Sequence, residues 1–128
     1  MTLFHELKGK RILLIDGDES IRDSMRMFFH NEGLHIDSVE TAEEGIELLG
    51  KQHYHIIITD CNLPGMDGLQ FFKHINKLCP DSFKILMSSL AQDLPSQAAD
   101  LGVDEYIQKP FSAKLIKDSL SHYREGKK

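Results

Sequence analysis

The stretch Ile56–Gly68, IIITDCNLPGMDG, decides how the rest of this chain is interpreted. An apolar run ends on one carboxylate, Asp60, and a loop that contains Pro64 and Gly65 follows at once. Asp67 then stands where the N-cap of a new helix is expected. The segment predicts a buried strand that delivers an acid to its own carboxyl end, where a site rather than a core would be built.

Strand and helix patterns alternate along the whole chain around this segment. Helical spacing of apolar residues follows each strand pattern, and Thr41 with Glu44 forms a capping box. We expect strands at 12–15, 34–39, 54–59, 83–87 and 104–108. We expect helices from Ile21 to about Gly33, from Thr41 through Ile46 and Leu49, from Leu69 to Ile75, from Leu94 to Leu101, and from Ser112 through Ile116, Leu120 and Tyr123.

This alternation predicts an α/β fold with a doubly wound parallel sheet of flavodoxin-like type. The central strands are apolar without alternation, as in strands that helices cover on both faces. Helical crossovers between parallel strands are right-handed. We expect the strand order 2-1-3-4-5, with a site at the carboxyl ends of the first and third strands, where the order reverses.

Composition limits the classes of function. The 128 residues predict one domain, which we place at 11–124, with an N-terminal extension at 1–10 and a frayed tail at 125–128. A net charge of -5 argues against direct nucleic-acid binding. No apolar run would cross a membrane or form a signal peptide. Cys61 and Cys79 are expected to be reduced thiols in a cytoplasmic protein.

Polar side chains stand at the ends of four of the expected strands. Asp16 follows the first strand, Asp60 the third, Ser88 the fourth and Lys109 the fifth. Two carboxylates about 4 Å apart would repel by about 4 kcal/mol at an effective dielectric constant near 20. A proton or a cation must offset this repulsion, and Mg²⁺ with Lys109 would do so.

Such a site can accept an anion on an acid. A carboxylate can attack phosphorus and form an aspartyl phosphate. The metal and Lys109 would screen the repulsion between the attacking carboxylate and the phosphate.

These residues resemble the receiver domain of response regulators in two-component signalling, from about Arg11 to Tyr123. The resemblance rests on the acidic turn at Asp16, the segment Asp60–Gly68, and the residues Ser88, Tyr106 and Lys109-Pro110-Phe111. It implies that Asp60 is the phosphoacceptor, that Ser88 and Lys109 contact the phosphoryl group, and that Tyr106 moves with Ser88. It further implies metal contacts from Asp16, Asp60 and the backbone carbonyl of Asn62, and a cis bond before Pro110.

One position departs from the family pattern. Receivers have two adjacent acids after the first strand, and the second ligates the metal directly; here that position is Gly17. Asp18 lies one place further along. It is either a substitute metal ligand or the N-cap of the first helix, and we favour the cap. We therefore expect weakened Mg²⁺ binding.

Three functions are compatible with these residues. The first is a switch of a two-component system or phosphorelay, phosphorylated by a histidine kinase or a phosphotransfer domain. It would signal to an output domain, a partner protein or a second copy through the face formed by 83–87, 94–101 and 104–108. The second is a degenerate receiver that docks proteins without phosphorylation. The third is a phosphatase with Asp16 as nucleophile. The acidic loop argues against a flavodoxin-like electron carrier, because it would repel a flavin phosphate.

Overall fold

A computed structural model of the chain describes residues 6–89 and 101–123. The strands in these ranges are β1 (Arg11–Ile15), β2 (His35–Val39), β3 (Ile56–Asp60), β4 (Phe83–Ser88) and β5 (Glu105–Gln108). The helices are α2 (Glu19–Asn31), α3 (Ala42–Leu49), α4 (Gly68–Ile75) and α6 (Ala113–Leu120). No helix in the described ranges has the length and apolar character needed to cross a membrane.

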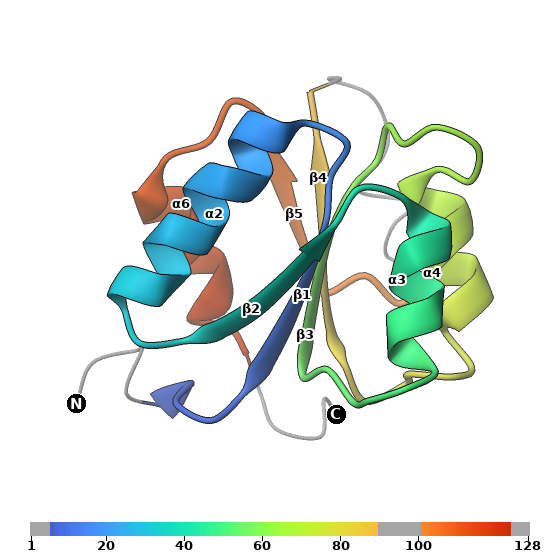
Figure 1. The fold of residues 1–128 in the computed structure, drawn as a ribbon, viewed down its shortest axis with the longest axis horizontal. Coiled ribbons are helices and arrows are strands. Elements are labelled where there is room, and N and C mark those ends of the chain that lie inside the picture. Colours follow the sequence, from blue (N-terminus) through green and yellow to red (C-terminus); the bar gives the residue numbers. More distant parts are fainter. Residues whose placement is uncertain (1–5, 90–100, 124–128) are drawn as a thin grey trace.

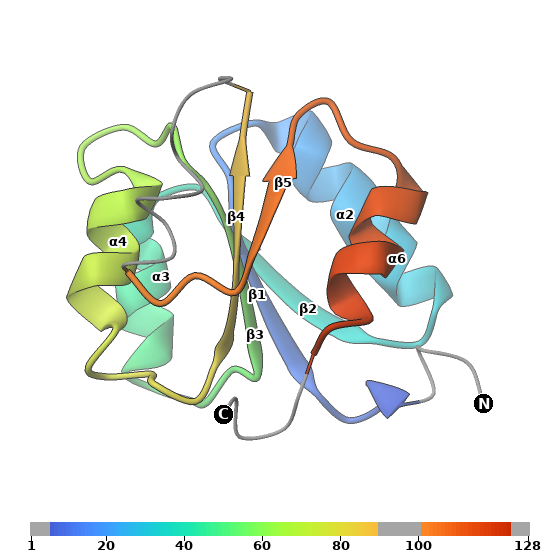
Figure 2. The ribbon, with the colours of Figure 1, turned by 180° about the vertical axis from the view of Figure 1, so that it is seen from behind.

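The five strands form one parallel sheet in the order β2-β1-β3-β4-β5. This confirms the predicted doubly wound topology. Helices α2 and α6 cover one face of the sheet, and α3 and α4 cover the other (Figures 1 and 2). Because all strands run in the same direction, their carboxyl ends lie along one edge.

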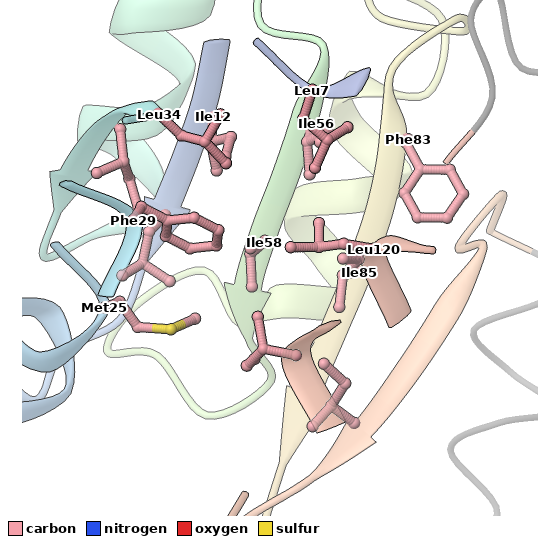
Figure 3. Packing of buried hydrophobic residues seen from close by; sticks show 14 of the residues in the cluster. Leu7, Ile12, Met25, Phe29, Leu34, Ile56, Ile58, Phe83, Ile85 and Leu120 are labelled. Carbon is pink, nitrogen blue, oxygen red and sulfur yellow. The ribbon is translucent and has the colours of Figure 1, made fainter. Parts of the chain in front are cut away.

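Both faces of the three central strands are buried. On one face, isoleucines from β1, β3 and β4 pack against Phe29 of α2 and Leu120 of α6 (Figure 3). On the other face, Leu13 and Ile57 pack with Phe71 and Phe72 of α4. Each fully buried Leu, Ile or Phe side chain contributes roughly 1.5–3 kcal/mol to folding. Continuous apolar runs without alternation follow directly from this two-sided burial.

Side-chain caps begin the helices where the sequence predicts them. Thr41 and Asp67 each form a complete capping box, with Glu44 and Gln70 respectively. The hydroxyl of Ser112 accepts a hydrogen bond from the backbone N–H of Leu115 at the start of α6. These caps satisfy backbone N–H groups that have no partner within the helix.

Several boundaries differ from those predicted. The strand expected at 54–59 begins at Ile56, because Tyr54 instead buries its ring and donates its hydroxyl hydrogen to Asp37 at 2.5 Å. The last helix ends at Leu120, and Tyr123 packs beyond it, edge-on against Phe83. The helix expected at 94–101 falls almost entirely outside the described residues. Before Arg11, Leu7 is buried in the core cluster next to α2 and α6.

The start of α4 lies unusually close to the end of β3. A Cβ atom at Gly68 would lie 2.4 Å from the carbonyl oxygen of Asp60 and 2.9 Å from the Cα atom of Cys61. The N–H of Gly68 donates to the carbonyl oxygen of Cys61 at 2.9 Å. Only glycine allows the helix to turn back this tightly after the strand that carries Asp60.

We predict that Gly68→Ala lowers the free energy of unfolding by about 1–3 kcal/mol, because the new methyl group must displace backbone atoms. Urea denaturation followed by circular dichroism measures this change. Gly17→Ala is the matched control, since a Cβ atom there meets nothing within 4 Å. Equal stability of Gly68→Ala and the wild type would show that the backbone relaxes at no cost.

Candidate functional site

The sheet brings the predicted polar residues to one edge. Asp16 directly follows β1, Asp60 ends β3 and Ser88 ends β4. The backbone N–H of Lys109 donates to the carbonyl oxygen of Ser88 at 2.7 Å, which places Lys109 at the end of β5. The peptide bond between Lys109 and Pro110 is cis.

Lys109 spans the two acids. Its Nζ atom lies 2.8 Å from Oδ2 of Asp16 and 3.4 Å from Oδ1 of Asp60. Asp16 is 1% exposed and Asp60 is 8% exposed, so both carboxylates are withdrawn from water. One ammonium group therefore faces two buried carboxylates.

Of the two carboxylates, that of Asp60 has fewer hydrogen-bond donors around it within the described residues. Within the described residues, its buried Oδ1 atom accepts no hydrogen bond, although the Lys109 ammonium lies at ion-pair distance. Burial raises the pKa of Asp60 above its ordinary value, the charge of Lys109 opposes this rise, and the negative charge of Asp16 adds to it. Asp60 thus carries a buried oxygen atom whose hydrogen-bonding capacity is unused within the described residues.

The turn between β1 and α2 orients Asp18 toward the helix. Oδ1 of Asp18 accepts hydrogen bonds from the backbone N–H of Ser20 at 2.9 Å and from its hydroxyl at 2.8 Å. These bonds lower the pKa of Asp18. Asp18 is the N-cap of α2, which agrees with the interpretation favoured from sequence.

Two further hydrogen bonds hold this turn against the site. The N–H of Asp18 donates to Oδ1 of Asp16 at 2.9 Å. The guanidinium group of Arg22 donates to the carbonyl oxygen of Asp16 at 2.7 Å. Arg22 is not among the site residues predicted from the sequence; its only signal there is a cation in the first turns of the helix that follows an acidic loop.

Gly17 leaves open space beside the acids. A Cβ atom built at Gly17 has no other heavy atom within 4 Å, and its backbone is not left-handed. A larger side chain therefore fits at the position where receivers have an acid.

The carboxylate oxygens of Asp16 and Asp60 suit a hard divalent cation, although they give it few protein ligands. Mg²⁺ is commonly held by one or two carboxylates together with phosphate oxygens and water. Asp16 and Asp60 supply two carboxylates, and Oδ1 of Asp60 lacks a hydrogen bond within the described residues. Residues 6–89 and 101–123 contain no group of three or more His, Cys, Asp or Glu side chains that could hold a metal ion.

Ser88 and Tyr106 lie on the same face of the sheet. Tyr106 pairs in register with Leu86, two residues before Ser88, and side chains two apart share a face. Ser88 is fully buried, whereas Tyr106 is half-buried against the cluster below α3 and α4. The segment that joins their strands, 90–100, lies outside the described residues.

A groove of about 540 Å³ opens beside Lys109, between α2 and the start of α6. Apolar side chains line most of it, including Met25, Phe28 and Phe111. Local sequence patterns do not predict this groove, because it depends on how two helices distant in sequence pack together.

The cysteines do not contribute to the site. Both are free thiols, and Cys61 packs into the cluster below α3 and α4. Burial raises the pKa of Cys61 and of Cys79 above the ordinary thiol value. Their nucleophilic thiolate forms are therefore disfavoured.

Comparison with known proteins gives a consistent result. The model of the response regulator receiver domain family matches residues 12–121. The chain is 33% identical over 119 residues to the C4-dicarboxylate transport transcriptional regulatory protein DctD of Rhizobium meliloti, covering 91% of the chain and 26% of that protein. It is 30% identical over 106 residues to the transcriptional regulatory protein ResD of Bacillus subtilis, covering 83% of the chain and 44% of that protein. The chain thus spans less than half the length of either relative.

Solved structures with this fold are also similar. A CheY-like receiver domain protein from Methanospirillum hungatei has a TM-score of 0.80 and 30% identity, with 89% of this chain and 95% of that chain covered. The signal receiver domain of an HD domain-containing protein from Pseudomonas fluorescens has a TM-score of 0.84 at 22% identity, with 89% and 93% covered. The latter similarity bears on the fold alone.

We predict that Asp60→Asn stabilises the protein near neutral pH, by on the order of 1 kcal/mol, because it removes a buried and incompletely bonded charge. A raised pKa in the folded state means that the stability associated with Asp60 is lost as the pH rises through that pKa. The gain from Asp60→Asn should therefore disappear as the pH falls below about 3.9, the ordinary pKa of Asp.

Thermal unfolding at several pH values measures this difference, with the exposed residue Asp81 changed to Asn as the control. Destabilisation of Asp60→Asn at neutral pH would contradict the prediction, since it would mean that the ion pair with Lys109 outweighs the cost of burial.

Proposed function

The chain belongs to the response regulator receiver domain family, and we propose that it is a phosphorylation-controlled switch with Asp60 as phosphoacceptor. A histidine kinase or a phosphotransfer domain would supply the phosphoryl group. The observation that carries this proposal is the buried Asp60 carboxylate, whose Oδ1 atom accepts no hydrogen bond from the residues that the structure describes and lies 3.4 Å from the ammonium of Lys109.

The chemistry follows from these groups. A carboxylate oxygen of Asp60 attacks the phosphorus of a phosphohistidine, the phosphorus–nitrogen bond breaks, and the histidine leaves. Lys109 pairs with the developing negative charge at a site where little water competes. Mg²⁺, held by Asp16, Asp60 and the backbone carbonyl of Asn62, would add positive charge that screens the carboxylate from the phosphoryl group.

Phosphorylation would be transmitted through Ser88 and Tyr106. The Ser88 hydroxyl would turn toward the phosphoryl group, and Tyr106 would move into the space behind it. The face of β4 and β5, together with the helix expected from sequence at 94–101, would then favour one of two arrangements and bind its partner. The transcriptional regulators that the chain resembles are longer, which supports an output domain or a partner protein on this face. A second copy of the chain is another candidate.

The geometry favours Asp60 over Asp16 as the nucleophile. Both carboxylate oxygens of Asp16 are bonded, Oδ1 to the N–H of Asp18 and Oδ2 to Lys109. This supports a receiver over a phosphatase that would use Asp16. The docking module without phosphorylation is the second candidate, because Gly17 removes one expected metal ligand.

We predict that a small phosphodonor such as phosphoramidate, with Mg²⁺, forms an acyl phosphate on Asp60 that hydroxylamine cleaves. Peptide mapping by mass spectrometry locates the modified residue. Asp60→Asn should abolish the modification, whereas Asp81→Asn should leave it unchanged. Modification of Asp16 would instead support the phosphatase.

An NMR titration with beryllofluoride, a mimic of the phosphoryl group, separates the docking module from the switch. A switch requires the amide resonances around Ser88 and Tyr106 to shift on addition of beryllofluoride and Mg²⁺. A spectrum that does not change at saturation would support the docking module.

We also propose that Gly17 weakens Mg²⁺ binding, and predict that Gly17→Asp tightens it roughly tenfold, equivalent to about 1.4 kcal/mol. Calorimetric titration measures the dissociation constant. Asp18→Ser is the matched control, because serine keeps the N-cap but removes the carboxylate. Weaker binding by Asp18→Ser, together with no gain from Gly17→Asp, would mean that Asp18 already acts as the missing ligand.

A further inference from the structure

The turn between β1 and α2 contains a residue that has no side chain to hold it. Gly17 lies between Asp16 and Asp18, and a Cβ atom built there would meet no other heavy atom within 4 Å. Glycine loses more backbone freedom on folding than any other residue, so fixing it in one conformation costs more entropy. The turn that carries Asp16 to the site therefore needs a constraint from outside Gly17.

Arg22 donates hydrogen bonds to both neighbours of Gly17. Its guanidinium group donates to the carbonyl oxygen of Asp16 at 2.7 Å, and its backbone N–H donates to the carbonyl oxygen of Asp18 at 3.1 Å. A hydrogen bond from a charged donor is roughly twice as strong as one between neutral groups. One residue of α2 thus holds the backbone on both sides of the glycine.

The place of Arg22 in α2 indicates that this contact, rather than the helix, favours a cation here. Arg22 is the fourth residue of a helix that begins at Glu19. Helical side chains lean toward the N-terminus, so a long guanidinium group at this position reaches back to the turn. The helix dipole favours anions near this terminus, not cations. The hydrogen bond to Asp16 offsets that unfavourable placement.

The same turn orients the carboxylate of Asp16. The backbone N–H of Asp16 donates to the carbonyl oxygen of Val39 in β2 at 3.1 Å, which fixes the residue on its strand side. Beyond the turn, the N–H of Asp18 donates to Oδ1 of Asp16 at 2.9 Å. A change in the backbone of Gly17 that moves Asp18 would break this bond and release the carboxylate.

We propose that Arg22 is a positioning residue, which keeps the turn at Gly17 closed and holds the Asp16 carboxylate in the orientation that a metal ion would meet. The inference rests on the proposed function in one respect, since it takes Asp16 to be a metal ligand. Arg22 acts through Asp16 rather than on the reacting atoms. When the turn opens, the apparent affinity for Mg²⁺ falls in proportion to the fraction of closed turn.

Hydrogen exchange of the Asp18 amide tests this role without metal or phosphodonor, because that N–H is bonded to the Asp16 carboxylate. We expect Arg22→Gln to speed this exchange about tenfold, as measured by NMR, because a hydrogen bond from a charged donor is lost. The amide of Gln70 is the internal control. It donates to Oδ1 of Asp67 at 2.9 Å in the turn before α4 and should keep its rate.

Arg26→Gln is the matched control variant. Arg26 lies one turn further along α2 with its side chain 47% exposed, and its guanidinium group contacts Asp23 and Ser38. This substitution removes the same charge from the same helix and should leave the exchange of Asp18 unchanged. An equal effect of Arg22→Gln and Arg26→Gln would overturn the proposal, as would equal acceleration of the Asp18 and Gln70 amides.

Gly17→Ala separates the order of the turn from the charge of Arg22. Alanine fits at this position and reduces the freedom of the open turn. By calorimetry, we expect Arg22→Gln to weaken Mg²⁺ binding about fourfold, and Gly17→Ala to recover about twofold in that background. With Arg22 present, Gly17→Ala should change the affinity by less than about 1.5-fold, because the turn is already largely closed. No recovery would mean that Arg22 acts through its charge, and the positioning role would be wrong.

The wild-type protein provides a measurement that does not depend on the folding of a variant. Nitrogen-15 relaxation reports the motion of the Gly17 amide on the picosecond to nanosecond timescale. We expect an order parameter of about 0.85, the value of rigid backbone. A value below about 0.6 would show that the turn is mobile despite Arg22, which contradicts the proposal.

The two proposals fail in different ways. If Asp60 is never phosphorylated, the switch is wrong, while the exchange of the Asp18 amide still reports on Arg22. If Asp60 is phosphorylated but Arg22→Gln leaves that exchange unchanged, the switch stands and the positioning role is wrong.

Discussion

Burial of the three central strands on both faces is the constraint on which the rest of this structure depends. Strands β1, β3 and β4 contribute isoleucines and leucines to clusters on opposite sides of the sheet. A polar side chain within those strands needs a partner of its own, so polar groups gather where the strands end. Parallel direction places all of those ends on one edge. Asp16 and Asp60 meet Lys109 there, and Ser88 ends the neighbouring strand on the same edge.

The same constraint makes charge balance the central problem of the site. Two carboxylates at that edge are withdrawn from water and need a cation. Lys109 supplies this cation from the end of the edge strand β5, 93 residues after Asp16 in the chain. Its ammonium lies closer to Asp16 than to Asp60, and Oδ1 of Asp60 accepts no hydrogen bond within residues 6–89 and 101–123. Lys109 thus pairs more closely with Asp16 than with Asp60. This difference distinguishes the carboxylate that is already paired from the one proposed to react.

Local details keep this arrangement in place. The contact of Gly68 with the end of β3 brings α4 directly against the strand that carries Asp60. Arg22 and the N-cap at Asp18 hold the β1–α2 turn beside the site. Gly17 lies in this turn and offers no side chain to the site. Packing requires glycine at position 68 but not at position 17. The open space at Gly17 means that its effect on the site is chemical rather than steric.

Much of the fold could be predicted from local patterns. Apolar runs, helical spacing and caps at Thr41, Asp67 and Ser112 depend on neighbouring residues, and the structure places them as expected. The acids and the lysine at the strand ends could be predicted for the same reason. The strand boundary at Tyr54 could not, because its ring and hydroxyl are held by Asp37, a residue of another strand.

The sequence by itself determined the order of the elements, the parallel sheet and the residues that stand at its edge, because hydrophobic periodicity is local and a helix between successive strands implies parallel pairing. Only the tertiary structure decided which acid Lys109 pairs with, how Asp18 is used, and that Arg22 and a groove between α2 and α6 adjoin the site. These outcomes depend on distances of a few ångströms between side chains from distant segments, and on which of several possible partners lies nearest to each charged group.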